Sequence, residues 1–157
     1  MSIEIERKFL VKNDDFKKES FQKKHIKQGY LNSDKNRTVR VRIANDKAFI
    51  TVKGKSNSSG TSRFEWEKNI DIQDAENLLL LCESSIIDKT RFLVKKGNHI
   101  FEIDEFYGDN NGLTLAEIEL NSENEKFDKP TWLGKEVTGD SKYYNSSISK
   151  HPFKNWT

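Results

Sequence analysis

The sequence has little of several residue types, and each scarcity excludes a class of protein. Cys82 is its one cysteine, so no intramolecular disulfide and no cysteine-based metal site can form. No apolar run approaches the roughly 18 residues of a membrane-spanning helix, and no basic segment followed by an apolar one opens the chain. We therefore expect a cytoplasmic protein with no membrane partner.

An excess of charge of one sign is also missing. The 27 basic and 25 acidic residues leave a net charge of +2, which provides no electrostatic footprint for nucleic acid. Only 34% of the residues are hydrophobic, but 11% are aromatic and the apolar residues are patterned, which argues against disorder. The 157 residues contain no linker and no low-complexity tract, so we expect a single domain, 1–157.

What the sequence does contain is a two-residue alternation that recurs along the chain. In residues 3–11, Glu4, Glu6 and Lys8 share one face of a strand, while Ile3 and Phe9 lie on the other. Similar strands are predicted over 28–31, 38–43, 47–53, 63–68, 86–95, 99–107, 113–120 and 134–138. Their charged face carries Glu4, Glu6, Lys8, Arg40, Arg42, Lys53, Glu65, Glu67, Lys89, Arg91, Glu102, Asp104, Glu117 and Glu119.

Helix signals are fewer. Capping residues and periodicity predict helices over about 13–25, 73–83 and 141–150, and a short helix starting at the capping box Ser122–Glu125. The leucines of 73–83 exceed a single stripe, so we expect that helix, including Cys82, to be well buried. The Gly- and Ser-rich segment 54–62 is predicted to be a mobile loop.

Two architectures fit these strands. In one, a sheet packs its apolar face on helices and exposes its charged face to water. In the other, the fold is α+β and the strands close into a barrel, with apolar faces outward under helices and charges lining a tunnel. Burying charge is costly unless it is paired or bound to a ligand, which favours the first.

Three details favour the barrel. The charged positions are almost never Ser, Thr, Asn or Gln, which a merely solvated face would use. Arg40 and Arg42 form a pair suited to bidentate phosphate binding, and the acidic residues come in E-x-E pairs suited to a hard cation. Arginine clamps and a carboxylate-held Mg²⁺ or Mn²⁺ are what phosphoryl transfer to water requires. The residues alone leave both architectures open.

The same residues resemble a known superfamily. Glu4-x-Glu6-x-Lys8 is similar to the E-x-E-x-K signature of the CYTH superfamily, the triphosphate tunnel metalloenzymes. Later marks follow in order, among them Arg40-x-Arg42, Glu65-x-Glu67 and Glu117-x-Glu119. The resemblance covers almost the whole chain. It implies a closed eight-stranded antiparallel β-barrel with helices outside, a divalent cation (Mg²⁺ or Mn²⁺) and a small-molecule triphosphate substrate. The length resembles that of the short bacterial members, which are similar to inorganic triphosphatases.

The resemblance also implies roles for individual residues. The implied metal ligands are Glu4, Glu6, Glu117, Glu119 and Asp104. The implied phosphate contacts are Lys8, Arg40, Arg42, Lys53, Lys89, Arg91 and Lys135. Catalytic roles fall to Glu65, Glu67, Lys89 and Lys8, where the two glutamates orient basic groups, hold a second metal or position water. Tyr30 contacts substrate or packs, and Arg63 receives no role.

The lead hypothesis is hydrolysis of tripolyphosphate to pyrophosphate and phosphate. The alternatives are a nucleoside triphosphatase or class IV-type adenylate cyclase acting on ATP, a thiamine triphosphatase, and a polyphosphate-binding module without turnover. Many members of the superfamily are dimers, so a homodimer stays open, although the sequence defines no interface.

Overall fold

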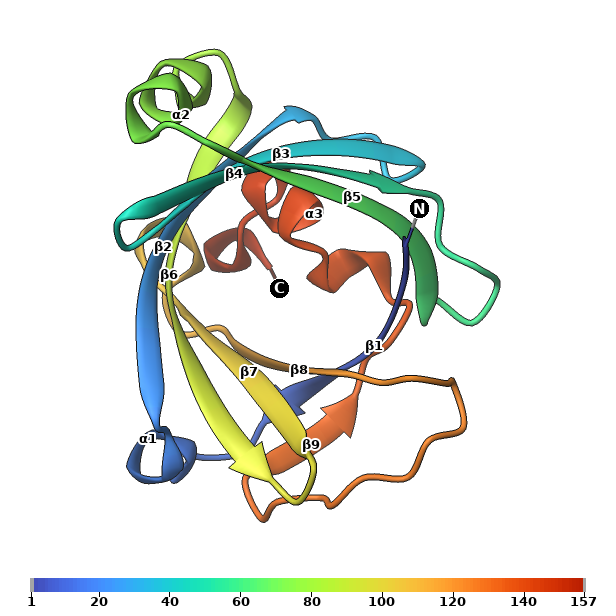
Figure 1. Ribbon diagram of the computed structural model, residues 1–157. Helices are drawn as coiled ribbons and strands as arrows, with labels where there is room; N and C mark the ends of the chain where they lie inside the picture. Colours follow the sequence, from blue (N-terminus) through green and yellow to red (C-terminus); the bar gives the residue numbers. More distant parts are fainter. Residues whose placement is uncertain (1, 157) are drawn as a thin grey trace.

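Strands dominate the computed structural model, which describes residues 2–156 (Figure 1). They are β1 (Ser2–Val11), β2 (Gln22–Asn32), β3 (Arg37–Ala44), β4 (Lys47–Gly54), β5 (Ser62–Ile70), β6 (Glu83–Lys96), β7 (His99–Phe106), β8 (Thr114–Glu119) and β9 (Leu133–Glu136). They form one sheet in the order β5-β4-β3-β2-β6-β7-β8-β1-β9, and every pairing is antiparallel.

Strand β1 closes the sheet into a barrel. Its residues 2–5 pair with β5, and its residues 6–10 pair with β8. The first and last strands of the eight-stranded order, β5 and β1, are therefore hydrogen-bonded to each other. β9 is a short addition beside the second half of β1. The predicted closed eight-stranded antiparallel barrel is confirmed, and closure is what gives the charged strand faces an enclosed interior.

Two of the helices lie outside the barrel. α1 (Phe16–Glu19) buries Phe16, and α2 (Ile72–Leu79) packs Ala75 against Val41 and Ala48 on the outer face of β3 and β4. Among the described residues, no helix is long and apolar enough to cross a membrane.

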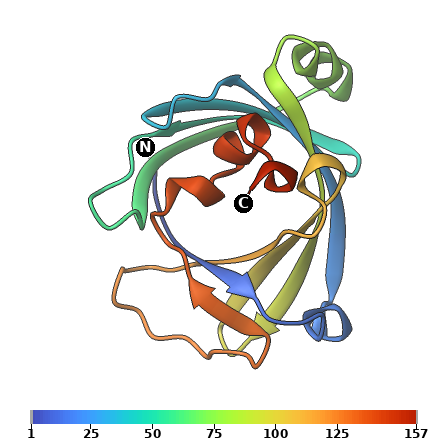
Figure 2. The same cartoon turned by 180° about the vertical axis from the view of Figure 1, so that it is seen from behind.

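The third helix, α3 (Asn145–Lys150), lies across one end of the ring of strands, together with the 3-10 turns η2 (Ser141–Tyr143) and η3 (Phe153–Asn155) (Figures 1 and 2). The remaining 3-10 turn is η1 (Gly108–Asn110), which follows β7. The sequence predicted helices on the outside only, so this closure of one end is a feature that the strand pattern did not indicate.

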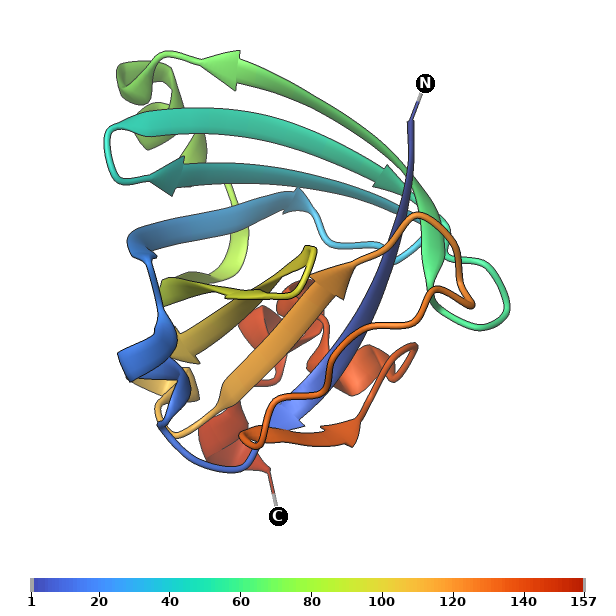
Figure 3. The same ribbon diagram turned by 60° about the horizontal axis from the view of Figure 1, so that its bottom comes forward.

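The outer core lies under an irregular segment rather than under a helix. Phe9 of β1 and Phe101 of β7 pack edge-to-face with Phe127, and Trp132 packs with Phe16 and Phe101. Figure 3 shows residues 120–132, drawn in orange, crossing the outer side of β1. The expected outward direction of Ile5 and Phe9 is therefore correct, but the cover comes mainly from coil and α1, and Ile3 is exposed.

A second core fills the closed end of the barrel. Leu10, Ile87, Phe106 and Leu115 follow the period-2 pattern of the inward charged positions, yet they are apolar and pack around Ile148 of α3. On β1, β6, β7 and β8 the inward face thus changes from charged to apolar as it approaches α3. The change seals the end by burying hydrocarbon instead of charge.

Ile148 offers a test of this seal. Replacing Ile148 by Val removes one methylene from a fully buried side chain, which costs about 0.5–1.5 kcal/mol. We expect the thermal unfolding midpoint to fall by about 1–6 °C, measured by circular dichroism. An unchanged midpoint would mean that α3 does not contribute to the cooperative unit.

Several local predictions were wrong, and tertiary contacts explain why. Residues 22–25 are strand, because they pair with residues 90–93 of β6. Residues 121–132 contain no helix, although Glu125 accepts a hydrogen bond from the backbone of Asn121. α2 ends at Leu79, so Leu80 and Leu81 are 85% and 73% exposed rather than buried, and Cys82 is half-buried beyond the helix.

Candidate active site

The barrel encloses a cavity of about 200 Å³ whose wall is almost entirely polar. Its lining includes six basic residues, seven glutamates and a few neutral residues. They are Glu4, Glu6, Lys8, Tyr30, Thr38, Arg40, Arg42, Thr51, Lys53, Ser56, Gly60, Arg63, Glu65, Glu67, Arg91, Glu102, Glu117, Glu119, Tyr144, Asn145 and Ser146. Every strand from β1 to β8 supplies at least one charged or aromatic residue to this wall.

The acidic part of the wall lies on β1, β8 and β7. Strand register places Glu6 opposite Glu119, and Glu117 between Lys8 and Glu102. Like charges directly opposite each other destabilise a sheet, so this arrangement needs a compensating positive group. Lys8 lies 3.9 Å from Glu117 through Nζ, which compensates only part of the negative charge.

The protonation of Glu6 and Glu117 reflects this crowding. Burial, reinforced by the neighbouring Glu117 carboxylate, raises the pKa of Glu6 well above its usual value. Burial acts the same way on Glu117, but Lys8 and the hydrogen bond from Glu6 outweigh it and lower the pKa of Glu117. The two carboxyl groups therefore titrate as a coupled pair, in which Glu6 binds a proton more tightly than Glu117 does.

The basic part of the wall faces the glutamates from β3, β4 and β6. Arg40 donates to Thr51 Oγ1 at 3.3 Å and lies 3.7 Å from Glu67, but its Nε is buried and has no partner among the described residues. Arg42 donates from Nε to the neutral Gln28 Oε1 at 2.7 Å. Burial, with Arg40 and Arg91 nearby, lowers the pKa of Arg42 to about 9, so the guanidinium still carries its charge at neutral pH.

Lys53 of β4 bridges toward the acidic side. Its Nζ donates to Glu4 Oε1 at 2.8 Å and lies 3.5 Å from Glu65 Oε2. Burial raises the pKa of Glu4, although Lys53 opposes the shift. Lys53 is thus the link between the two halves of the cavity wall.

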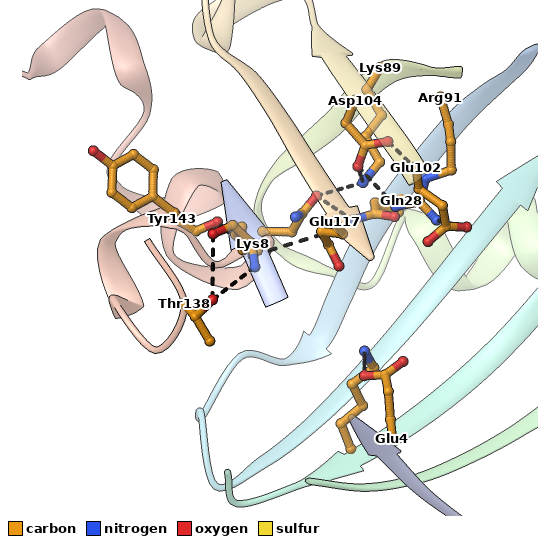
Figure 4. A network of polar contacts seen from close by, with 12 residues as sticks. Glu4, Lys8, Gln28, Lys89, Arg91, Glu102, Asp104, Glu117, Thr138 and Tyr143 are labelled. Carbon is orange, nitrogen blue, oxygen red and sulfur yellow. Dashed lines mark hydrogen bonds and ion pairs between the residues drawn. The ribbon is translucent and has the colours of Figure 1, made fainter. Parts of the chain in front are cut away.

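Behind the wall, β6 and β7 hold a buried ionic network (Figure 4). Arg91 binds Asp104 through two hydrogen bonds of 2.8 and 2.9 Å, and Lys89 donates to the same carboxylate at 2.7 Å. Burial alone would raise the pKa of Asp104, but Arg91 and Lys89 hold it far below the usual range. Arg91 reaches the cavity, whereas Lys89 and Asp104 do not line it.

The segment that closes the barrel end also reaches the cavity. Tyr144, Asn145 and Ser146 line it, and Lys8 donates from Nζ to the Tyr143 carbonyl oxygen at 3.1 Å. Lys8 also lies over the Tyr144 ring, 5.3 Å from its centroid. The closed end is therefore part of the site and not only a structural seal.

Comparison with known proteins identifies this arrangement. The chain matches the CYTH domain over residues 2–152. The protein belongs to the CYTH domain family. It is 47% identical to a protein named inorganic triphosphatase from Acetivibrio thermocellus, with 99% of each chain covered. It is 35% identical to a protein of the same name from Nitrosomonas europaea, covering 93% of this chain and 96% of the relative.

A solved CYTH structure shares the barrel. The crystal structure of an inorganic triphosphatase superposes with a TM-score of 0.64 at 33% identity, covering 92% of this chain and 96% of the other. The resemblance drawn from the motifs, Glu4-x-Glu6-x-Lys8 first among them, is confirmed at the level of the family.

Within this CYTH barrel, most residues singled out from the sequence meet in one cavity. The exceptions are Lys89 and Asp104, which lie in the buried layer, and Lys135, whose exposed side chain lies on β9 outside the cavity. Lys135 does not reach the site because β9 pairs outside the closed ring.

The sequence pattern also left some lining residues unmarked. Arg63, Thr38 and Thr51 were missed, although Arg63 alternates with Glu65 along β5, which was a usable signal. Asn145 follows the tyrosines of the C-terminal motif, but no strand pattern marked it as facing a cavity.

The carboxylates of the CYTH cavity fit a hard divalent cation. Glu6, Glu117 and Glu119 present oxygen donors whose mutual repulsion such an ion would relieve. Among the described residues, no three acidic, histidine or cysteine side chains already stand in a metal-binding arrangement. Mg²⁺ commonly takes one or two carboxylates and completes its shell with water and substrate phosphate oxygens, which suits this donor set.

Proposed function

We propose that this CYTH protein hydrolyses inorganic tripolyphosphate to pyrophosphate and phosphate, with Mg²⁺ or Mn²⁺ as cofactor. The observation that carries the proposal is a polar cavity inside the barrel, in which arginines without full pairing face a cluster of glutamates. The two similar proteins named inorganic triphosphatase support the choice of tripolyphosphate.

The charge of the wall supports the need for a cation. Six basic and seven acidic residues line the cavity, so the wall alone does not attract a polyanion. A divalent cation beside the glutamates would give the site a net positive charge and leave the arginines free for phosphate oxygens. We assign the metal to Glu4, Glu6, Glu117 and Glu119.

The basic groups bind and orient the substrate. Arg40 has an unpartnered Nε and Arg42 bonds to the neutral Gln28, so both have donors that a phosphate oxygen would satisfy. Lys8, Lys53 and Arg91 complete a ring of basic groups around the cavity. This ring would stabilise negative charge that develops on the transferring phosphoryl group.

The remaining residues act through others. Glu67 accepts from Thr51 at 2.7 Å beside Arg40, and Glu65 lies beside Lys53, so both orient basic groups or a water molecule. Lys89 and Asp104 position Arg91 from the buried layer. When bound, the metal would neutralise phosphate oxygens and lower the pKa of a coordinated water.

An assay of phosphate release tests the proposal. Tripolyphosphate, ATP and thiamine triphosphate are each supplied with Mg²⁺, Mn²⁺ or EDTA. We expect rapid phosphate release from tripolyphosphate with either metal and none in EDTA. Formation of cyclic AMP from ATP would overturn the proposal in favour of a cyclase, and binding of tripolyphosphate without turnover would favour a binding module.

A further inference from the structure

One side chain at the closed end of the barrel lies between the buried layer and the cavity. Asn145 lines the cavity, and its Oδ1 accepts two hydrogen bonds from buried side chains, one from Lys89 Nζ at 2.8 Å and one from Gln28 Nε2 at 2.9 Å. Lys89 and Gln28 are completely buried. No hydrogen bond of the Asn145 Nδ2 group to a described residue is present.

The orientation of this amide is dictated by chemistry. Arginine and lysine side chains donate hydrogen bonds and accept none. Arg42 donates to Gln28, so the Gln28 oxygen must face Arg42 and its NH₂ group must face Asn145. Asn145 then receives donors from both Gln28 and Lys89, so the atom facing them must be its oxygen.

The planar amide leaves one direction for the other end of Asn145. Because Oδ1 is bonded to Lys89 and Gln28, the NH₂ group is turned to neither of them, and Asn145 borders the cavity. We propose that Asn145 is a substrate-binding residue whose NH₂ group donates to a phosphate oxygen, and that Gln28 is a positioning residue that fixes both Asn145 and Arg42. The proposal rests on the proposed function insofar as the ligand is a triphosphate.

Substitutions at Asn145 distinguish a substrate-binding role from a purely structural one, because they change ligand affinity and stability differently. Asn145→Asp keeps an oxygen to accept from Lys89 and Gln28, and adds negative charge 2.8 Å from the Lys89 ammonium group. A structural asparagine would tolerate this change or gain stability from it. A substrate-binding asparagine would not, because the donor is replaced by an anion that repels phosphate.

The experiment compares wild type, Asn145→Asp, Asn145→Ala and the control Ser149→Ala. Ser149 is buried on the same helix and bonds to the Ser146 carbonyl oxygen, but it does not line the cavity. Binding of diimidotriphosphate, a triphosphate with non-hydrolysable NH bridges, is measured by calorimetry with Mg²⁺. Thermal unfolding is recorded without ligand, and KM and kcat for tripolyphosphate are measured separately.

We expect Asn145→Ala to weaken binding about 10- to 100-fold, as for loss of a hydrogen bond to a charged group. Asn145→Asp should weaken it more, with an unfolding midpoint no lower than wild type, and Ser149→Ala should bind as wild type does. Binding by Asn145→Ala within about threefold of wild type overturns the inference, because an aspartate in the cavity wall would repel phosphate whether or not Asn145 binds it. If wild type binds the analogue but does not hydrolyse tripolyphosphate, the proposed function fails while the binding series still decides the role of Asn145.

Discussion

Replacing Arg42 by alanine is expected to lower kcat/KM for tripolyphosphate by about a thousandfold, the scale for a group that stabilises transition-state charge. Arg42 is the strongest candidate for this effect because no carboxylate among the described residues lies within ion-pair distance of it. Its one side-chain hydrogen-bond partner among the described residues is the neutral Gln28, and burial together with two neighbouring arginines lowers its pKa. The guanidinium is therefore held in the wall at an electrostatic cost that a bound phosphate would offset.

The fold should survive this change. Arg42→Ala removes a buried charge that neighbouring cations disfavour, which offsets the loss of the hydrogen bond to Gln28. Arg37→Ala is the matched control, since Arg37 lies on the same strand with an exposed side chain and does not line the cavity. Phosphate release and thermal unfolding are measured on both variants. Near-native turnover by Arg42→Ala would show that Arg42 has no part in phosphate binding.

Replacing Glu6 by glutamine is expected to reduce turnover at saturating Mn²⁺ by about a thousandfold, and to weaken Mn²⁺ binding by at least about 100-fold. Glu6 faces Glu119 across the β1–β8 pair, and burial together with the neighbouring Glu117 raises its pKa, so it lies at the centre of the acidic group. Glutamine keeps the shape of the side chain but removes the anionic oxygens that a hard cation requires.

Stability should move in the opposite direction. The raised pKa of Glu6 means that its charged form is disfavoured in the metal-free fold, so a neutral isostere should leave the unfolding midpoint unchanged or higher. Manganese binding is followed by electron paramagnetic resonance and turnover by phosphate release. Glu105→Gln is the control, because Glu105 pairs with Lys17 on the outer side of β7. Wild-type manganese affinity in Glu6→Gln would remove Glu6 from the metal site.

The two-residue alternation of charged and apolar residues predicted much of the fold. Successive side chains of a strand point to opposite faces, so the alternation alone groups Glu4, Glu6 and Lys8 on one face. All three line the cavity. The hairpin turn between β3 and β4 also depends on local sequence. Asn45 adopts φ 54° there, as a two-residue hairpin turn requires. Local capping signals were weaker, and strand pairing overrode the predicted helix at residues 22–25.

The sequence by itself determined which residues are charged, which share a strand face, and that the E-x-E and R-x-R pairs suit a cation and a phosphate. Only the tertiary structure decided that these faces look inward, because closure depends on β1 pairing with both β5 and β8 across long stretches of chain. It likewise placed Lys89 and Asp104 behind the wall and brought Asn145 to it. Whether an inward side chain borders the cavity or is buried depends on what packs against the end of its strand. Here that is α3, and the apolar inward residues Leu10, Ile87 and Leu115 are buried with its Ile148.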